Sequence, residues 1–285
     1  MEDVTRIRKV IEKIQKLPTL PNVVQNVLKI VENPKTTAKD INRVISQDPA
    51  LSSKVLRLVN SAFYGFPRRI STVTDAIIIL GFNTVKSLAL SASVFDVFKG
   101  ESIFFDRTAF WQHSIGVGVA AQLIAKRVRY AKVEEIMIAG ILHDIGKIAL
   151  DQYAHEEFNK ILATVKEKNM AFLEAEEQVT SCNHCDVGKW MADKWNFPQV
   201  ILEPIAFHHF PEKSVEFSNI TAMIHLADII CKSQNIGYSG DNIIPELNKK
   251  AWNDLAITKD DIEHIISELK DEIKKTEAFL SLARG

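Results

Sequence analysis

The stretch that decides the fold is Gly140-Ile141-Leu142-His143-Asp144-Ile145-Gly146-Lys147. An adjacent imidazole and carboxylate, His143 and Asp144, stand here at the end of an apolar helical segment. A carboxylate buried without a partner loses its hydration and gains no interaction in exchange. A divalent cation offsets that free-energy cost by supplying the opposite charge. We therefore interpret the pair as the corner of a metal site. Gly146 is expected to let the backbone turn sharply beside the ion, and Lys147 to place an ammonium where it could meet a phosphate.

Two more residues that can bind a metal are predicted to lie on apolar helical faces. His113 points with the apolar face of a helix that begins at Asp106 or Thr108, and small residues such as Gly118 let another helix come close. Asp228 lies on the apolar face of a later helix, where a carboxylate needs a partner. With the first pair they make two imidazoles and two carboxylates, a mixture that suits zinc, manganese, iron or nickel. The alternative for each residue is a hydrogen-bonded core side chain.

A second group of imidazoles strengthens the prediction. It consists of His184 and the adjacent pair His208 and His209. These three rings could complete a site for a second ion, with Asp144 as the bridging ligand. Two ions held about 4 Å apart can clamp a phosphoryl group and activate water between them. The alternative is that these histidines only pack in the core, or form hydrogen bonds that orient the metal ligands without binding the metal themselves.

The helical period dominates the chain, and the predicted fold class is all-α. Short-range signals place the first helices through capping residues and through the position of proline and glycine. These signals are Pro21 as a first helical residue, Asn33-Pro34 as a stop, Thr37 as a start, Asp48-Pro49 as a cap and first residue, Gly65 as a stop, residues 74–80 as a helix closed by Gly81, and Asn83 as a cap.

Composition shifts divide the chain into three predicted parts. A break at Lys99-Gly100-Glu101 separates an N-terminal helical part, residues 1–100, from a histidine-rich metal-binding core, residues 101–240. The remainder, residues 241–285, is a helical tail. Its segment from Thr258 to Leu282 carries one apolar stripe behind a capping arrangement, which predicts a helix packed back on the domain. The alternative is a helix that forms a homodimer.

Charge and cysteine content narrow the classes of function. The 285 residues include 35 basic and 36 acidic side chains, so the net charge of -1 favours neither nucleic acid nor an anionic membrane as a partner. The charged N-terminus is not a signal peptide, and the longest apolar runs are too short to span a bilayer. Three cysteines, an odd number, favour a reducing, cytoplasmic location.

Three weaker motifs suggest other functions. Cys182-Asn183-His184-Cys185 suggests a redox pair or half of a zinc knuckle, but no second such pair follows, so we interpret these cysteines as structural or incidental. Residues 79–83 are faintly similar to a helix-hairpin-helix, but the local positive charge is thin and DNA binding is not expected. Arg68-Arg69 is interpreted as a solvated turn rather than a phosphate clamp.

The order His113, His143-Asp144 and Asp228 resembles the metal signature of the HD superfamily of phosphohydrolases. The additional histidines are similar to the ligand set of the HD-GYP cyclic-di-GMP phosphodiesterases, but Phe210-Pro211 stands where those enzymes carry Gly-Tyr-Pro. From about residue 10 to residue 235 the chain resembles the HDOD branch, the HD-related output domains. The most specific matching strings are residues 17–21, 46–51, 59–65, 76–81 and 195–198.

The resemblance implies an HD-like helical bundle with an N-terminal helical subdomain, acting in bacterial signal transduction. We expect an output protein that binds one or two divalent transition-metal ions, and a nucleotide or phosphate ligand, and passes its state to a protein partner. The alternative is an active phosphohydrolase or phosphodiesterase for a nucleotide or cyclic dinucleotide, with Asp144 and Lys147 as catalytic residues. A third, weaker hypothesis is a scaffold that has lost its metal. Many HDOD members lack ligands, whereas this chain keeps the whole set.

Overall fold

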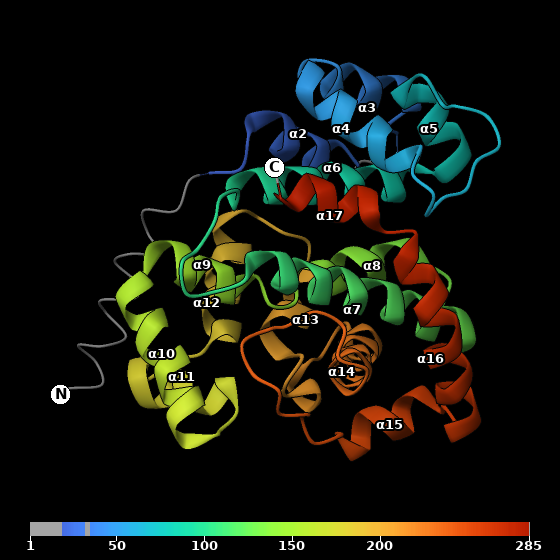
Figure 1. The fold of residues 1–285 in the computed structure, drawn as a ribbon. Helices are drawn as coiled ribbons and strands as arrows, with labels where there is room; N and C mark the ends of the chain where they lie inside the picture. The colour runs from blue at the N-terminus through green and yellow to red at the C-terminus, as the bar shows by residue number, and fades with distance from the viewer. Residues whose placement is uncertain (1–18, 32–34, 285) are drawn as a thin grey trace.

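The structure, a computed structural model, describes residues 19–31 and 35–284, and over these residues the chain forms helices and no strand (Figure 1). The all-α prediction is therefore confirmed. Leu17-Pro18 and Asn33-Pro34, used in the sequence analysis, lie outside the described residues. The α-helices are α2 (Asn22–Val31), α3 (Ala38–Ile45), α4 (Pro49–Val59), α5 (Val73–Leu80), α6 (Phe82–Val97), α7 (Arg107–Arg127), α8 (Val133–Leu142), α9 (Ile145–Tyr153), α10 (His155–Lys168), α11 (Phe172–Thr180), α12 (His184–Lys194), α13 (Gln199–Phe207), α14 (Ser218–Ser233), α15 (Lys249–Leu255), α16 (Lys259–Lys274) and α17 (Glu277–Arg284), and a 3-10 turn, η1, spans Pro211–Lys213.

Local capping explains most of the predicted helix starts. Thr37 and Asp48 cap α3 and α4 with side-chain oxygens that accept backbone N–H bonds, as predicted. We predicted Pro21 as the first residue of a helix, but it lies one residue before α2. Its carbonyl oxygen accepts the first hydrogen bonds of that helix. Gly81, at φ +84°, closes α5 as expected.

Two predicted helix boundaries were wrong, and tertiary hydrogen bonds explain both. We expected α4 to continue to Gly65, but it ends at Val59. The Asn60 side chain pairs with both backbone groups of Ile70, at 2.8 Å each, and turns the chain away. Asn83 does not cap α6, because its side-chain amide donates instead to Glu135 on α8, at 2.7 Å.

Helix α7 lies at the centre of the molecule and packs against α8, α14, α16 and α17 (Figure 1). The close approach of α7 and α8 depends on small residues: a Cβ on Gly140 would lie 2.6 Å from Cα of Gly118. This packing brings the helix that carries His113 against the helix that ends at His143. None of the helices in the described part of the chain is both long and apolar enough to cross a membrane.

The C-terminal segment forms two helices rather than the single one that we predicted. Thr258 and Asp261 form the expected capping box of α16, but the helix ends at Lys274, and the Thr276 hydroxyl donates to the carbonyl of Ile273. The chain then turns, and α17 packs on α4, α6 and α7 (Figure 1). The prediction that this tail packs back on the domain is confirmed.

Candidate metal centre

One group of candidate ligands joins three elements that are far apart in the sequence. His113 comes from α7, His143 follows α8, and Asp228 comes from α14. Nε2 of His113 lies 3.0 Å from Oδ1 of Asp228, and Nε2 of His143 lies 4.0 Å from the same oxygen. All three side chains are buried, and their ligand atoms lie within 4.8 Å of one another. One divalent ion could bind all three.

Asp144, directly before α9, lies between this group and the second one. Its Oδ2 is 3.4 Å from Nε2 of His143 and accepts a hydrogen bond of 2.7 Å from Nζ of Lys147. Its Oδ1 is 3.1 Å from Nε2 of His184 and 3.4 Å from Nε2 of His208. The two oxygens of one carboxylate therefore face the two groups of imidazoles, which is the geometry that a bridging ligand requires.

The second group consists of the three histidines around the start of α12 and the end of α13. Asn183 caps α12 through a capping box and so orients His184, the first residue of that helix. Nε2 of His184 lies 3.1 Å from Nε2 of His209 and 3.4 Å from Nε2 of His208. Cys185 borders this group, with its Sγ 3.8 Å from Nδ1 of His208. All seven candidate ligands named from the sequence are thus brought together.

The buried imidazoles are oriented by the hydrogen-bond partners of Nδ1, the ring nitrogen that faces away from the centre. In four of the five candidate rings Nδ1 contacts a protein oxygen, which fixes the ring and leaves Nε2 directed inward. The partners are the Ile236 carbonyl for His113 at 3.2 Å, the Gly140 carbonyl for His143 at 2.7 Å, the Glu176 carboxylate for His184 at 2.5 Å and the Pro204 carbonyl for His208 at 3.1 Å.

Unpaired buried atoms test whether these residues fit a cation. Buried polar atoms in proteins normally have a hydrogen-bond partner. In the part of the chain that the structure describes, four buried atoms of this centre lack one: Nε2 of His113, Nε2 of His143, Oδ1 of Asp144 and Oδ1 of Asp228. The atoms on His113, His143 and Asp228 converge on one place, and Oδ1 of Asp144 faces the second group of histidines. All four atoms are lone-pair donors to metals. The residues therefore fit a divalent cation.

The charge in the centre keeps both carboxylates ionised. Burial raises the pKa of Asp144, but the surrounding imidazoles and the Lys147 ammonium outweigh burial and hold that pKa well below its usual range. Burial also raises the pKa of Asp228, but the Lys232 ammonium and the neighbouring His113 outweigh burial and hold that pKa well below its usual range. An ionised carboxylate is the form that binds a cation, so the aspartates are ready to bind at neutral pH.

Gly146 has a different role from the one that we predicted. It makes no sharp turn, because it lies inside α9 with a helical backbone. A Cβ at this position would lie 2.0 Å from the carbonyl oxygen of His184. Glycine is therefore needed for the close packing of α9 on α12, and this packing brings Asp144 to His184.

The sequence analysis missed Glu176, which is fully buried on α11 and holds His184. Phe172 and Thr180, one turn before and one turn after it, share its buried face. A carboxylate on the apolar face of a short helix was the available signal, the same signal that pointed to Asp228. Carboxylates behind metal-binding histidines raise the basicity of the ring and hold its tautomer.

The sequence profile of the HDOD domain matches residues 17–211, which is more than half of the chain. The chain belongs to the HDOD family. An HDOD domain protein of unknown function from Geobacter sulfurreducens is 27% identical in sequence, with a TM-score of 0.79 over 99% of this chain and 97% of that one. A protein described as a proposed phosphohydrolase from Shewanella amazonensis SB2B is 25% identical, with a TM-score of 0.71 over 96% of each chain.

An uncharacterized protein of Treponema pallidum (strain Nichols) is also similar to this HDOD protein. The two are 26% identical over 220 residues, which cover 76% of this chain. The same residues cover only 42% of the Treponema protein, so the HDOD protein matches less than half of that relative's length.

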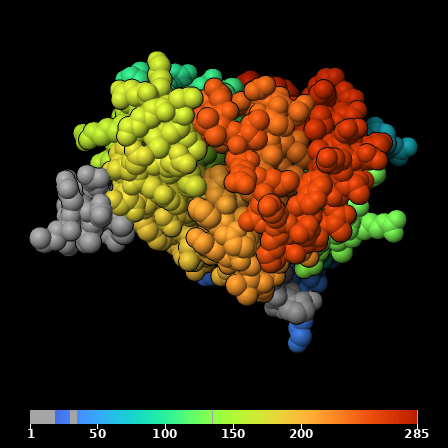
Figure 2. Space-filling model, turned by 90° about the horizontal axis from the view of Figure 1, so that it is seen from below, coloured from blue at the N-terminus to red at the C-terminus, as the bar shows by residue number. Residues whose placement is uncertain are grey.

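A cavity of about 280 Å³ reaches the second group of candidate ligands in the HDOD protein. Lys147, His184 and His209 line its inner end. The start of α11 and residues 241–246 both contribute to its lining, and Figure 2 looks onto the face where these two parts of the chain meet. A small molecule can therefore reach the centre from this side.

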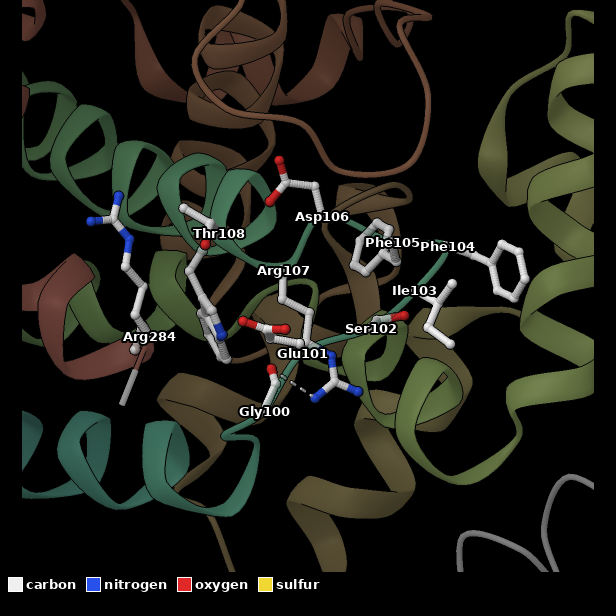
Figure 3. Close-up of a pocket in the computed structure, with 12 residues that line it drawn as sticks. Gly100, Glu101, Ser102, Ile103, Phe104, Phe105, Asp106, Arg107, Thr108 and Arg284 are labelled. Carbon is white, nitrogen blue, oxygen red and sulfur yellow. Dashed lines mark hydrogen bonds between the residues drawn. The ribbon is translucent and has the colours of Figure 1, made fainter.

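A second cavity, of about 540 Å³, lies beside the connection between α6 and α7. Figure 3 shows its residues, among them Arg107, which donates to the carbonyl of Gly100. Arg107 also forms a buried ion pair with Asp151, at 2.6 Å. None of the candidate ligands lines this cavity, and we assign it no function.

Proposed function

We propose that this HDOD protein is a bacterial signalling-output module whose HD-type metal centre binds a phosphorylated ligand and passes its state to a protein partner. The observation that carries the proposal is the set of four unpaired, buried ligand atoms, together with a cavity that reaches the neighbouring His184 and His209 from the surface. Membership of the HDOD family supports the signalling role.

The residues divide the task between them in this proposal. His113, His143 and Asp228 would hold one ion, and the three histidines of the second group would hold another, with Asp144 between the two. A bound divalent ion neutralises the carboxylates and polarises a phosphoryl oxygen. Lys147, held by Asp144 at the inner end of the cavity, neutralises further charge on the phosphate.

Metal analysis of ligand variants tests this proposal. Protein purified without chelators should contain one or two ions of iron, manganese, zinc or nickel per chain. His143→Ala and Asp228→Ala should each lose the ion of the first group, because each removes a ligand from a group of three. His264→Ala is the matched control, since His264 is exposed on α16. Equal metal content in all four proteins, or no metal in any, would contradict the proposal.

A second candidate function is that of an active metal-dependent phosphohydrolase. The cavity favours it, since Lys147 and two candidate ligands face a space that admits a phosphate ester. Wild-type protein loaded with manganese, iron or nickel should then cleave a generic phosphoester or a cyclic dinucleotide. Lys147→Gln should reduce the cleavage rate by a factor of roughly 100 or more, because charge stabilisation in the transition state is lost. Absence of cleavage with each of the three metals would remove this candidate.

A further inference from the structure

The segment 241–248, which we call the strap, forms one wall of the cavity mouth and lies outside the residues that match the HDOD profile. It has no regular secondary structure, yet both of its ends are fixed. At one end the Asp241 carboxylate accepts a hydrogen bond from the backbone N–H of Phe172, at 3.0 Å, and pairs with Lys232, at 3.1 Å. At the other end the N–H of Asn248 donates to Nε2 of His225, at 3.0 Å.

These contacts fix the strap in place. Because Asp241 binds the first residue of α11, the strap is held beside α11 at the edge of the cavity. The space that remains, about 280 Å³, is at the small end of ligand pockets, which range from roughly 300 to 1,000 Å³. A cavity of this size accepts one small ligand and is narrow for a molecule built from two nucleotides.

The charges along the cavity change sign from its inner end to its rim. Lys147 is buried at the inner end, where its ammonium donates to Asp144 at 2.7 Å beside the other candidate metal ligands. The walls are apolar, formed by Leu173 of α11 and by residues 243–245 of the strap. At the rim stand two exposed carboxylates, Glu174 and Glu246. The second lysine of the lining, Lys232, is already paired with Asp241 of the strap.

We propose that the strap makes the centre selective for a ligand of mononucleotide size with a single phosphate-bearing end, and that the rim carboxylates reject a cyclic dinucleotide. This inference rests on the function proposed above. The phosphate would lie against Lys147 and the metal ligands, and the body of the ligand between the apolar walls. The rim carboxylates accept hydrogen bonds from hydroxyl or amino groups but repel a second phosphate, which is how a site discriminates by an unfavourable contact.

Two ligands with the same base test this selectivity. Guanosine 5′-monophosphate and cyclic di-GMP are titrated by calorimetry into the full chain loaded with Mn²⁺, with metal content measured on the same sample. We expect the mononucleotide to bind at least about tenfold more tightly. In the double variant Glu174→Gln, Glu246→Gln the affinity for cyclic di-GMP should rise at least about threefold, while that for the mononucleotide changes little. Glu268→Gln, an exposed change on α16, should leave both affinities as they are.

The outcomes separate this inference from the proposed function. Equal or tighter binding of cyclic di-GMP by the wild type would overturn the inference, as would a preference that the rim variant leaves unchanged. Protein that holds metal but does not bind the mononucleotide would also overturn it, while leaving the metal centre in place. Protein that holds no metal would overturn both.

Discussion

At the scale of single residues, the candidate centre depends on how its rings are held as much as on which atoms face inward. Glu176 contacts Nδ1 of His184 at 2.5 Å, and both side chains are completely buried. The carboxylate increases the electron density of the ring and fixes it so that Nε2 faces Asp144. We therefore expect a residue outside the ligand set to contribute to metal affinity.

Glu176→Gln should weaken metal binding by roughly 10- to 100-fold, the usual effect of losing a supporting carboxylate. Glutamine has nearly the same shape, so the fold should remain. The measurement is metal affinity by competition with a chromophoric chelator, with circular dichroism to confirm folding. The neighbouring exposed residue Glu177 offers the control Glu177→Gln, which should bind metal like the wild type. Unchanged affinity in Glu176→Gln would show that His184 does not need this partner.

At the scale of helices, glycine decides how closely the elements that carry the candidate ligands approach each other. This holds where α8 packs on α7 and where α9 packs on α12. Gly146→Ala should destabilise the protein by at least about 2 kcal/mol, because the new Cβ meets backbone that cannot move independently. Gly116→Ala is the matched comparison, since there the contact at 2.6 Å is with a side-chain methyl group of Ile236 and not with backbone. Urea unfolding measures both. An equal, small decrease of the unfolding free energy in the two variants would argue against the need for glycine at the contact of α9 with α12.

Glu203, on α13, ties the start of α14 to the rest of the domain. Its carboxylate accepts hydrogen bonds from the Ser214 hydroxyl and from three backbone N–H groups, of residues 215, 216 and 217. Burial raises the pKa of Glu203, but these hydrogen bonds outweigh burial and lower it. A lowered pKa means that the ionised form stabilises the fold above the unfolded-state pKa of about 4.3, and that this contribution is lost as the pH falls.

Glu203→Gln should therefore be less stable than the wild type at pH 7, and the difference in unfolding free energy should shrink below about pH 4. Urea unfolding at a series of pH values measures it. A difference that stays constant into acid would show that the charge of Glu203 contributes nothing.

The helix scale also shows where prediction from sequence succeeded and where it failed. Thr37, Asp48 and Thr258 were predictable as caps because a cap side chain acts on backbone groups within three residues. The predicted stop at Gly65 and the predicted cap at Asn83 failed, because partners brought close only by folding decide both positions. Local chemistry can be inferred from a sequence window, whereas these long-range hydrogen bonds cannot.

At the scale of the whole molecule, the same distinction applies to the candidate centre. The candidate ligands and the helical faces that carry them could be predicted from the sequence, because burying an acid or imidazole on an apolar face costs free energy unless it has a partner. The position of the strap could not be predicted from the sequence, because it depends on contacts with α11 and α14 that no local sequence pattern encodes. The fold class and the family resemblance followed from the sequence, and the shape of the cavity required the structure.

The most direct test of the central claim is a crystal structure of the protein purified without chelators, with anomalous diffraction data collected at the absorption edge of the metal that elemental analysis identifies. We predict anomalous density beside Asp144, within bonding distance of Nε2 of His143 or of His184. Well-ordered side chains in this centre with no anomalous peak, after growth with manganese, iron, nickel or zinc, would contradict the account.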